Sequence, residues 1–324
     1  MNERPQRPRV ITILRGAMRS ALEWRLLTLF VATVLWTTLV ATFPSWGVLA
    51  SVLDYSPRAK EIAGSFDLLA FEDMSMALYR SAAPVTSGFA LATLLGVLSW
   101  PFLAGVAIGA TRRDRPRSFA EVLDGGIVYY GRMLRIGLVA IVPFALIGVV
   151  SIVAFRGALH YARHAILDSR ATLGYRFAIA VTLLVFFLVH ATIEVGRAAF
   201  GADDHLRSGW SAWLSGVRLT TRHPWPVLGA YVGATLTSYA VASALLILRL
   251  RISGPSGATL VTGFVLTQLA VASLGWGRAT RLFALTALTR SLSPARTAPA
   301  DAPEAGPTDI HVVTGSIASR PGSA

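Results

Sequence analysis

The chain has 324 residues, of which 54% are hydrophobic and only 15% are charged. Its apolar residues are gathered into several long uncharged runs, which match the roughly 20 residues that a helix needs to cross a bilayer. The formal charge of +13 is spread between these runs, which favours membrane topology and lipid phosphate over nucleic acid as the reason for it. Cysteine is absent, so disulfides and thiolate chemistry are excluded.

The first 25 residues combine positive charge with an apolar stripe. Six arginines lie in this segment, and its apolar residues recur at the spacing of one helix face: Val10, Ile13, Leu14, Ala17, Met18, Ala21 and Leu22. The pattern predicts a cytoplasmic amphipathic helix within residues 1–25. The uncharged run Leu26–Gly47 follows and exceeds the apolar core of a signal peptide, so we expect it to remain as a signal anchor and first span.

Residues 48–80 have a different character, with a net charge of −2. They predict an extracytoplasmic helical loop over the spans, with a plain spacer as the alternative.

A second amphipathic segment begins at Ser118, which forms a capping box with Glu121 because each side chain can satisfy a backbone N–H left over at a helix start. Its apolar stripe opens with Phe119, Val122 and Leu123, and the stripe recurs 91 positions later at Trp210, Trp213 and Leu214. We expect all three amphipathic segments to be interfacial helices that each lead the chain into a span. A cytoplasmic helix packed on its neighbours is the alternative for any one of them.

Five further apolar runs follow the first span, at residues 81–111, 136–155, 177–193, 224–248 and 258–277, and the run 177–193 begins the fourth span. Together the six spans make up a predicted membrane domain that covers residues 26–290. Gly105 and Gly109 form a GxxxG pair in the second span, a spacing that lets helix backbones approach closely. Residues 291–324 are rich in Pro, Ala, Ser, Thr and Gly, which predicts a disordered cytoplasmic tail.

The distribution of Arg and Lys predicts the orientation. One set of alternate loops, with both termini, carries 21 of these residues, and the other set carries 9. Because cytoplasmic loops hold the excess in bacterial membrane proteins, we expect a multi-pass protein of the bacterial inner membrane with both termini in the cytoplasm.

Basic side chains also gather in the loop predicted on the outer side. Arg156, His160, Arg163 and Arg170 are the candidate contacts for anionic lipid headgroups, and snorkelling of the arginines without a specific lipid is the alternative. His160 and His164 have a spacing found in metal sites, but their HYARH segment supplies no third ligand, so no metal site is predicted.

His190 and Glu194 are the ionisable pair of greatest interest, because they are one helical turn apart within the fourth predicted span. Such groups are costly at membrane depth and face the interior of a bundle, where they pair or line a path. A structural hydrogen-bonded pair is the preferred interpretation, and a transport or proton-relay role is the alternative.

Signatures of enzymes are absent from the sequence: there is no HExxH, GxSxG or GxxxxGK[ST] motif. We therefore predict a protein that is not an enzyme, with no catalytic residue and no cofactor.

Two segments carry a family resemblance: SFAEVLDGGIVYYGRMLR at 118–135 and GWSAWLSGVRLTTRHPW at 209–225. With the spans that follow them, they resemble uncharacterised bacterial six-span inner-membrane proteins, and they are loosely similar to the membrane domain attached to some glycerophosphodiester phosphodiesterases. The resemblance covers about residues 10–290 and implies a helical membrane module. The phosphodiesterase activity does not carry over, because this chain lacks that domain.

The sequence thus predicts an all-α polytopic membrane protein in which amphipathic interfacial helices alternate with spans in parallel repeats. The leading functional hypothesis is a non-enzymatic scaffold or partner subunit of an envelope complex, with the lipid bilayer, anionic phospholipid and other membrane proteins as partners. The alternative is a transporter or channel for a small solute.

Overall fold

The computed structural model describes residues 10–57, 62, 67–112, 118–203, 205–252, 254 and 256–292. All the regular secondary structure in these ranges is helical, and six helical segments are long and apolar enough to cross a membrane. The chain is therefore an all-α, multi-span membrane protein, which confirms the predicted fold class. Most of the predicted tail, from residue 293 onward, lies outside the described residues.

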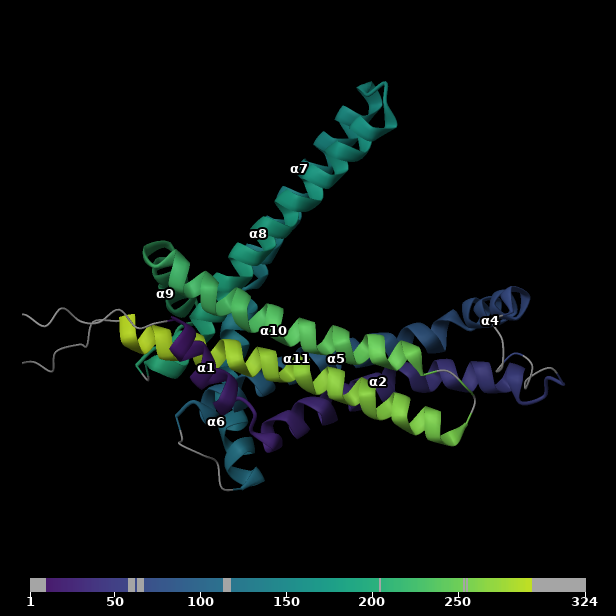
Figure 1. Cartoon of the computed structure of the whole chain (residues 1–324), viewed down its shortest axis with the longest axis horizontal. Helices are drawn as coiled ribbons and strands as arrows, with labels where there is room; N and C mark the ends of the chain where they lie inside the picture. Colours follow the sequence, from purple (N-terminus) through teal and green to yellow (C-terminus); the bar gives the residue numbers. More distant parts are fainter. Residues whose placement is uncertain are drawn as a thin grey trace, which may run out of the picture. The chain divides into compact units, whose positions relative to one another are not determined.

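The described helices repeat one order three times: a short amphipathic helix, a first span and a second span (Figure 1). The first copy comprises α1 (Val10–Ser20), α2 (Trp24–Leu53) and α5 (Ala82–Ala110), with α4 (Leu68–Arg80) inserted between its spans. The second comprises α6 (Phe119–Val139), α7 (Ile141–His164) and α8 (Asp168–Ala202). The third comprises α9 (Gly209–Arg222), α10 (Pro224–Arg251) and α11 (Gly257–Leu292).

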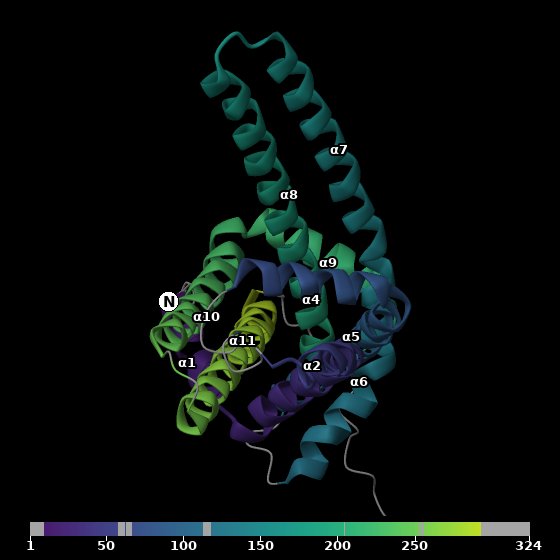
Figure 2. The same cartoon turned by 90° about the vertical axis from the view of Figure 1, so that its right-hand side faces the viewer.

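Within each copy the two spans pack against each other, α2 with α5, α7 with α8 and α10 with α11, and these pairs run side by side in both views (Figures 1 and 2). Each amphipathic helix packs on the second span of a neighbouring copy. The helix α6 lies on α5, α9 lies on α8, and α1 lies on α11. The three copies thus repeat one order of packing, as parallel repeats require, although the α7–α8 pair points obliquely away from the other two pairs (Figure 1).

The best packed part of the bundle is where the last turns of α5, α8 and α11 meet under the amphipathic helices, and we call it the closed end. Long stretches of these spans are buried there, including residues 103–108 of α5 and 193–201 of α8. The opposite halves of the spans expose large apolar side chains, such as Val149 and Leu184, as expected of surfaces that hydrocarbon solvates.

Arginines satisfy carbonyl groups that the helix ends leave free at the closed end. Arg290 donates to the carbonyl of Gly201 at 2.8 Å, and Arg112 donates to the carbonyl of Phe200 at 3.0 Å. The last four carbonyls of a helix have no partner within it, so these contacts fix the C-terminal turn of α8 to its neighbours.

Glycines and other small residues, with only part of the predicted apolar stripe, form the packed sides of α6 and α9. On α6, Val122 is buried, but Phe119 and Leu123 are 38% and 36% exposed. On α9, Trp210 is 48% exposed, Trp213 and Leu214 are partly exposed, and the buried residues are Gly209, Ala212, Gly216 and Thr220. The larger residues are left at the side that lipid can cover, which agrees with an interfacial position.

The physical reason is close backbone contact. A Cβ atom on Gly109 of α5 would lie 2.7 Å from the Cα atom of Gly125 on α6. A Cβ atom on Gly216 of α9 would lie 2.7 Å from the backbone nitrogen of Gly196 on α8. The predicted close approach at the GxxxG pair therefore occurs, with an amphipathic helix as the partner.

Two spans continue well beyond the uncharged runs from which they were predicted. The uncharged run 177–193 was expected to begin the fourth span and the sixth span was expected to end at residue 277, but α8 continues to Ala202 and α11 to Leu292. Hydropathy ends a span at the first charge, whereas here the charged turns are buried against other helices.

Candidate functional site: a buried charge cluster

A group of polar and charged side chains meets between α8, α10 and α11, toward the closed end. We call it the charge cluster and define it by seven residues: His190, Glu194, Arg197, Tyr231, Thr235, Arg278 and Arg281. Helical spacing explains how it forms, because the α8 members are three or four residues apart and so share one face.

Glu194 is the acidic member and is fully buried, with 0% exposure. Its Oε1 atom accepts a hydrogen bond from the Arg197 guanidinium at 2.5 Å. The His190 Nε2 atom is 3.9 Å from the same oxygen, which is too far for a hydrogen bond. The predicted neighbours His190 and Glu194 do come together, but Arg197 is the hydrogen-bonded partner of the carboxylate.

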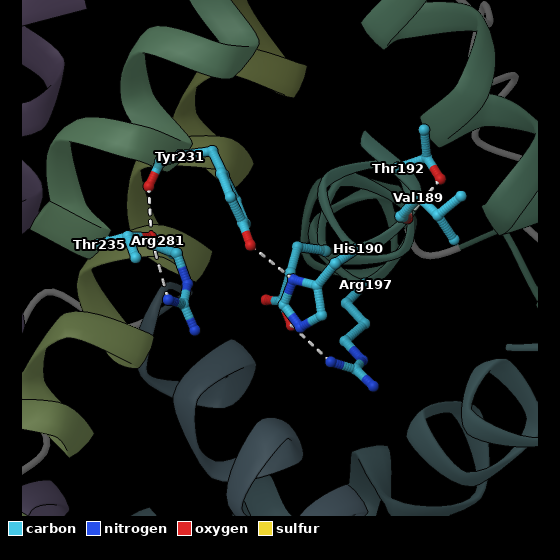
Figure 3. A network of polar contacts seen from close by, with 8 residues as sticks. Val189, His190, Thr192, Arg197, Tyr231, Thr235 and Arg281 are labelled. Carbon is cyan, nitrogen blue, oxygen red and sulfur yellow. Dashed lines mark hydrogen bonds and ion pairs between the residues drawn. The ribbon is translucent and has the colours of Figure 1, made fainter. Parts of the chain in front are cut away.

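His190 is instead tied to α10. Its Nδ1 atom is 2.8 Å from the Tyr231 hydroxyl, and Figure 3 shows Tyr231 reaching across to the imidazole. Arg281 of α11 donates to the Thr235 hydroxyl at 3.1 Å and lies 5.5 Å from the Tyr231 ring (Figure 3). These contacts join the three helices through polar groups.

Arg278 has no such partner among the described residues. Its side chain is 4% exposed, and none of its three guanidinium nitrogens has a hydrogen-bond acceptor in that part of the chain. The guanidinium lies over the Trp100 ring, 2.9 Å from the centroid, with the Phe30 ring 5.9 Å away. Aromatic faces attract a cation, but they do not replace the five hydrogen bonds that a guanidinium can donate.

The charges of the cluster do not balance. Three arginines, Arg197, Arg278 and Arg281, face the single carboxylate of Glu194. Arg278 interacts electrostatically with this carboxylate and with the other two arginines. The second oxygen of Glu194 and the Nε atom of Arg281 also have no hydrogen-bond partner in the described residues. Buried charges are normally paired because desolvation is costly, so this site has a deficit of negative charge.

The position of Arg278 in α11 indicates the depth of the cluster. It follows Gly257, the first residue of that helix, by 21 residues, which is about 32 Å at 1.5 Å per residue. A hydrocarbon layer is about 30 Å thick. The cluster therefore lies near one edge of such a layer, on the side of the closed end.

Sequence reasoning missed Arg278 and Arg281. They follow the predicted end of the sixth span and were counted with the tail. A signal was present, since apolar residues continue on both sides of them to Leu288 and would bury one face of a longer helix. Arg197 was likewise assigned to a loop.

The basic residues predicted as lipid contacts lie at the far ends of α7 and α8, away from the cluster. Arg156, His160, Arg163 and Arg170 are all exposed. His164 Nδ1 is 2.9 Å from the carbonyl oxygen of His160, and the two rings are 4.7 Å apart. The described residues contain no group of three or more side chains of the His, Asp or Glu type that could hold a metal ion.

No family model, curated protein sequence or solved structure matches this chain. The fold alone defines its class as an integral membrane protein with six candidate spans.

Proposed function

We propose that this chain is a non-enzymatic membrane protein that binds a small oxyanion in the charge cluster. The observation that carries the proposal is Arg278, a buried guanidinium without a hydrogen-bond acceptor in the described residues. A phosphate or carboxylate group is the natural complement, because a guanidinium donates to both in a planar, bidentate geometry. In this proposal the closed end faces the cytoplasm of a bacterial cell, so the anion enters from that side.

The composition of the cluster supports binding over chemistry. Arg197 and Glu194 form a pair that orients both side chains, and His190 and Tyr231 bind each other. Arg278 and Arg281 are then the residues that supply charge to the anion.

Arg278→Met tests the proposal in the purified full chain in neutral detergent, with inorganic phosphate as the probe. In wild type, phosphate raises the thermal denaturation midpoint in a saturable way, because binding to the folded state contributes about 2.7 kcal/mol at 100 times Kd. In Arg278→Met the midpoint without phosphate is higher than in wild type, since the apolar side chain removes a buried charge that has no hydrogen-bond acceptor in the described residues. The saturable response disappears in this variant.

Arg218→Met is the matched control, because Arg218 is exposed on α9. Phosphate also stabilises proteins by exclusion from their surfaces, and this effect should be equal in both variants. A saturable response that survives in Arg278→Met, or that is absent from wild type, would contradict the proposal.

The role predicted from the sequence, a scaffold or partner subunit of an envelope complex, is compatible with this site. We propose that the protein acts as a partner subunit or scaffold in an envelope complex, with the anion as a structural or regulatory ligand. The observation that favours this role is the pair α7 and α8, because α7 packs mainly on α8 and the pair points away from the other spans, where a second membrane protein could contact it (Figure 1). Recovery of no stable partner after purification in mild detergent would count against it.

A transporter for a small anion is the second candidate, because His190 and Glu194 are ionisable side chains on one face of a candidate span. The chain carries no charged residue between Arg176 and His190 on that span, so ionisable side chains of α8 do not continue the cluster toward the other face. Phosphate flux into proteoliposomes, lost in both His190→Ala and Glu194→Gln, would select the transporter; no flux in wild type would select the binding subunit.

A further inference from the structure

One difference among the three copies of the repeat lies at the contact between the amphipathic helix and the span on which it packs. Gly16, Gly125 and Gly216 occupy the same position, six residues after the start of each stripe at Val10, Phe119 and Trp210. In the second and third amphipathic helices this glycine touches the backbone of the facing span. At Gly16 an added Cβ atom would meet nothing within 4 Å.

The facing span differs as well. Gly105 of α5 and Gly196 of α8 are 91 positions apart, and another 91 positions lead to Ala287 of α11. A glycine pair closes two of the interfaces, whereas α1 and α11 present Gly16 and Ala287 to a cavity of about 610 Å³. This volume lies within the range of small-molecule sites, about 300–1,000 Å³.

The lining of this cavity is polar and basic. Hydroxyl groups come from Thr12, Ser20, Thr111 and Thr286, and charges come from Arg19, Glu23 and Arg290. The carboxylate of Glu23 pairs with Arg25 at 3.0 Å, so its charge is already balanced by that arginine. Arg19 and Arg290 are the cations of the lining. The lining also has an apolar part, which includes Ile13 of α1 and Phe283 of α11.

Two side chains of α11 give the cavity the features of a ligand site. Thr286 is 1% exposed and its hydroxyl has no hydrogen-bond partner in the described residues, although Thr289 nearby donates to the Leu285 carbonyl at 2.8 Å. Arg290 is held by carbonyl groups of Thr111 and Gly201, which use two of its five N–H groups. Both residues line the cavity: Arg290 with an anchored guanidinium, and Thr286 with a buried hydroxyl close to Gly201 of α8.

We infer that the cavity between α1 and α11 is a second site, separate from the charge cluster, which binds a phosphate ester. The phosphate would lie between Arg19 and Arg290 with the hydroxyl groups around it, and the apolar wall would take the organic part. Arginine pairs with phosphate through charge-assisted hydrogen bonds, which are stronger than neutral ones. A phospholipid headgroup and a soluble phosphate ester share this chemistry.

Gly16→Leu tests the site, because a Cβ atom there meets nothing within 4 Å and Gly16 lines the cavity that a larger side chain would occupy. Binding to the purified full chain in neutral detergent is measured with phosphatidylglycerol and with glycerol 3-phosphate. Gly131→Leu is the control, since a Cβ atom there also meets nothing within 4 Å. We expect Gly16→Leu and Arg19→Gln to weaken binding at least about tenfold, in Arg19→Gln through the loss of one charge-assisted hydrogen bond, while Gly131→Leu and Arg218→Met bind as wild type does.

The two probes separate the sources of the phosphate. Binding of phosphatidylglycerol alone assigns the site to a lipid, and binding of glycerol 3-phosphate assigns it to a soluble ester. The inference is overturned if neither probe binds, or if Gly16→Leu and Arg19→Gln bind both probes as tightly as wild type does.

Discussion

At the scale of single residues, Glu194 is the one carboxylate among several buried cations. It accepts a hydrogen bond from Arg197 and interacts electrostatically with His190, Arg281 and Arg278. Its burial is complete, so no solvent screens these interactions. The carboxylate is therefore more than an anchor for one arginine, because it offsets repulsion among all the cations around it.

Glu194→Gln should destabilise the folded protein by about 3–5 kcal/mol, because removing one partner of a buried pair leaves the other charge uncompensated. The denaturation midpoint of the purified protein in detergent measures this. Glu72→Gln on α4 is the control, since Glu72 is exposed and a charge there contributes little. Equal midpoints for the two variants would show that Glu194 does not balance the cluster.

Residue spacing predicted part of this site and could not predict the rest. The interval between His190 and Glu194 placed both on one face of α8, and the structure brings them to 3.9 Å. Tyr231, Arg278 and Arg281 come from two other spans, and their approach depends on how α8, α10 and α11 pack. Periodicity within one helix carries no information on that packing.

At the scale of helices, the amphipathic segments are the elements that the sequence described best. Their existence at α1, α6 and α9 followed from the spacing of apolar residues, and Ser118 caps α6 as predicted, with its hydroxyl accepting from the backbone N–H of Glu121 at 3.2 Å. On α6 and α9, the face that packs on a span is centred on glycines and not on the predicted apolar stripe. Hydropathy ranks residues by transfer to an apolar medium, whereas close packing against a span favours the smallest residue.

Gly216→Leu should separate α9 from α8, because a side chain there would collide with the backbone of Gly196 and with the Thr192 carbonyl. Backbone cannot move aside as a flexible side chain can, so we expect a loss of about 1–3 kcal/mol or more in stability. Gly131→Leu on α6 has open space and should change the midpoint little. Equal effects in the two variants would mean that the glycine contact does not hold α9 in place.

At the scale of the whole molecule, the repeat explains where the charged groups lie. Each second span runs toward the closed end, where an amphipathic helix of a neighbouring copy covers it. Because the second span of each copy ends in this same packed region, their arginine-rich turns converge at one end of the bundle. Two such spans, α8 and α11, supply all the arginines of the charge cluster, and the α1–α11 contact supplies the cavity.

The order of spans and amphipathic helices was predictable from the chain because hydrophobicity is a local property. The span ends were not, since a buried arginine and a loop arginine look alike in sequence. Arg278 illustrates the difference: its charge ended a predicted span, yet its burial between Trp100 and neighbouring helices extends the real one.

The absence of cysteine makes the central claim directly measurable, because single cysteines can be introduced into a chain that has none. In intact cells, a membrane-impermeant maleimide should label Tyr55→Cys, Ile166→Cys and Ser256→Cys, one site between the spans of each copy. Leu22→Cys and Ser208→Cys, beside the amphipathic helices, should react only after the membrane is opened. Protection of any of the first three sites, or labelling of either of the last two in intact cells, would contradict three parallel repeats with the closed end in the cytoplasm.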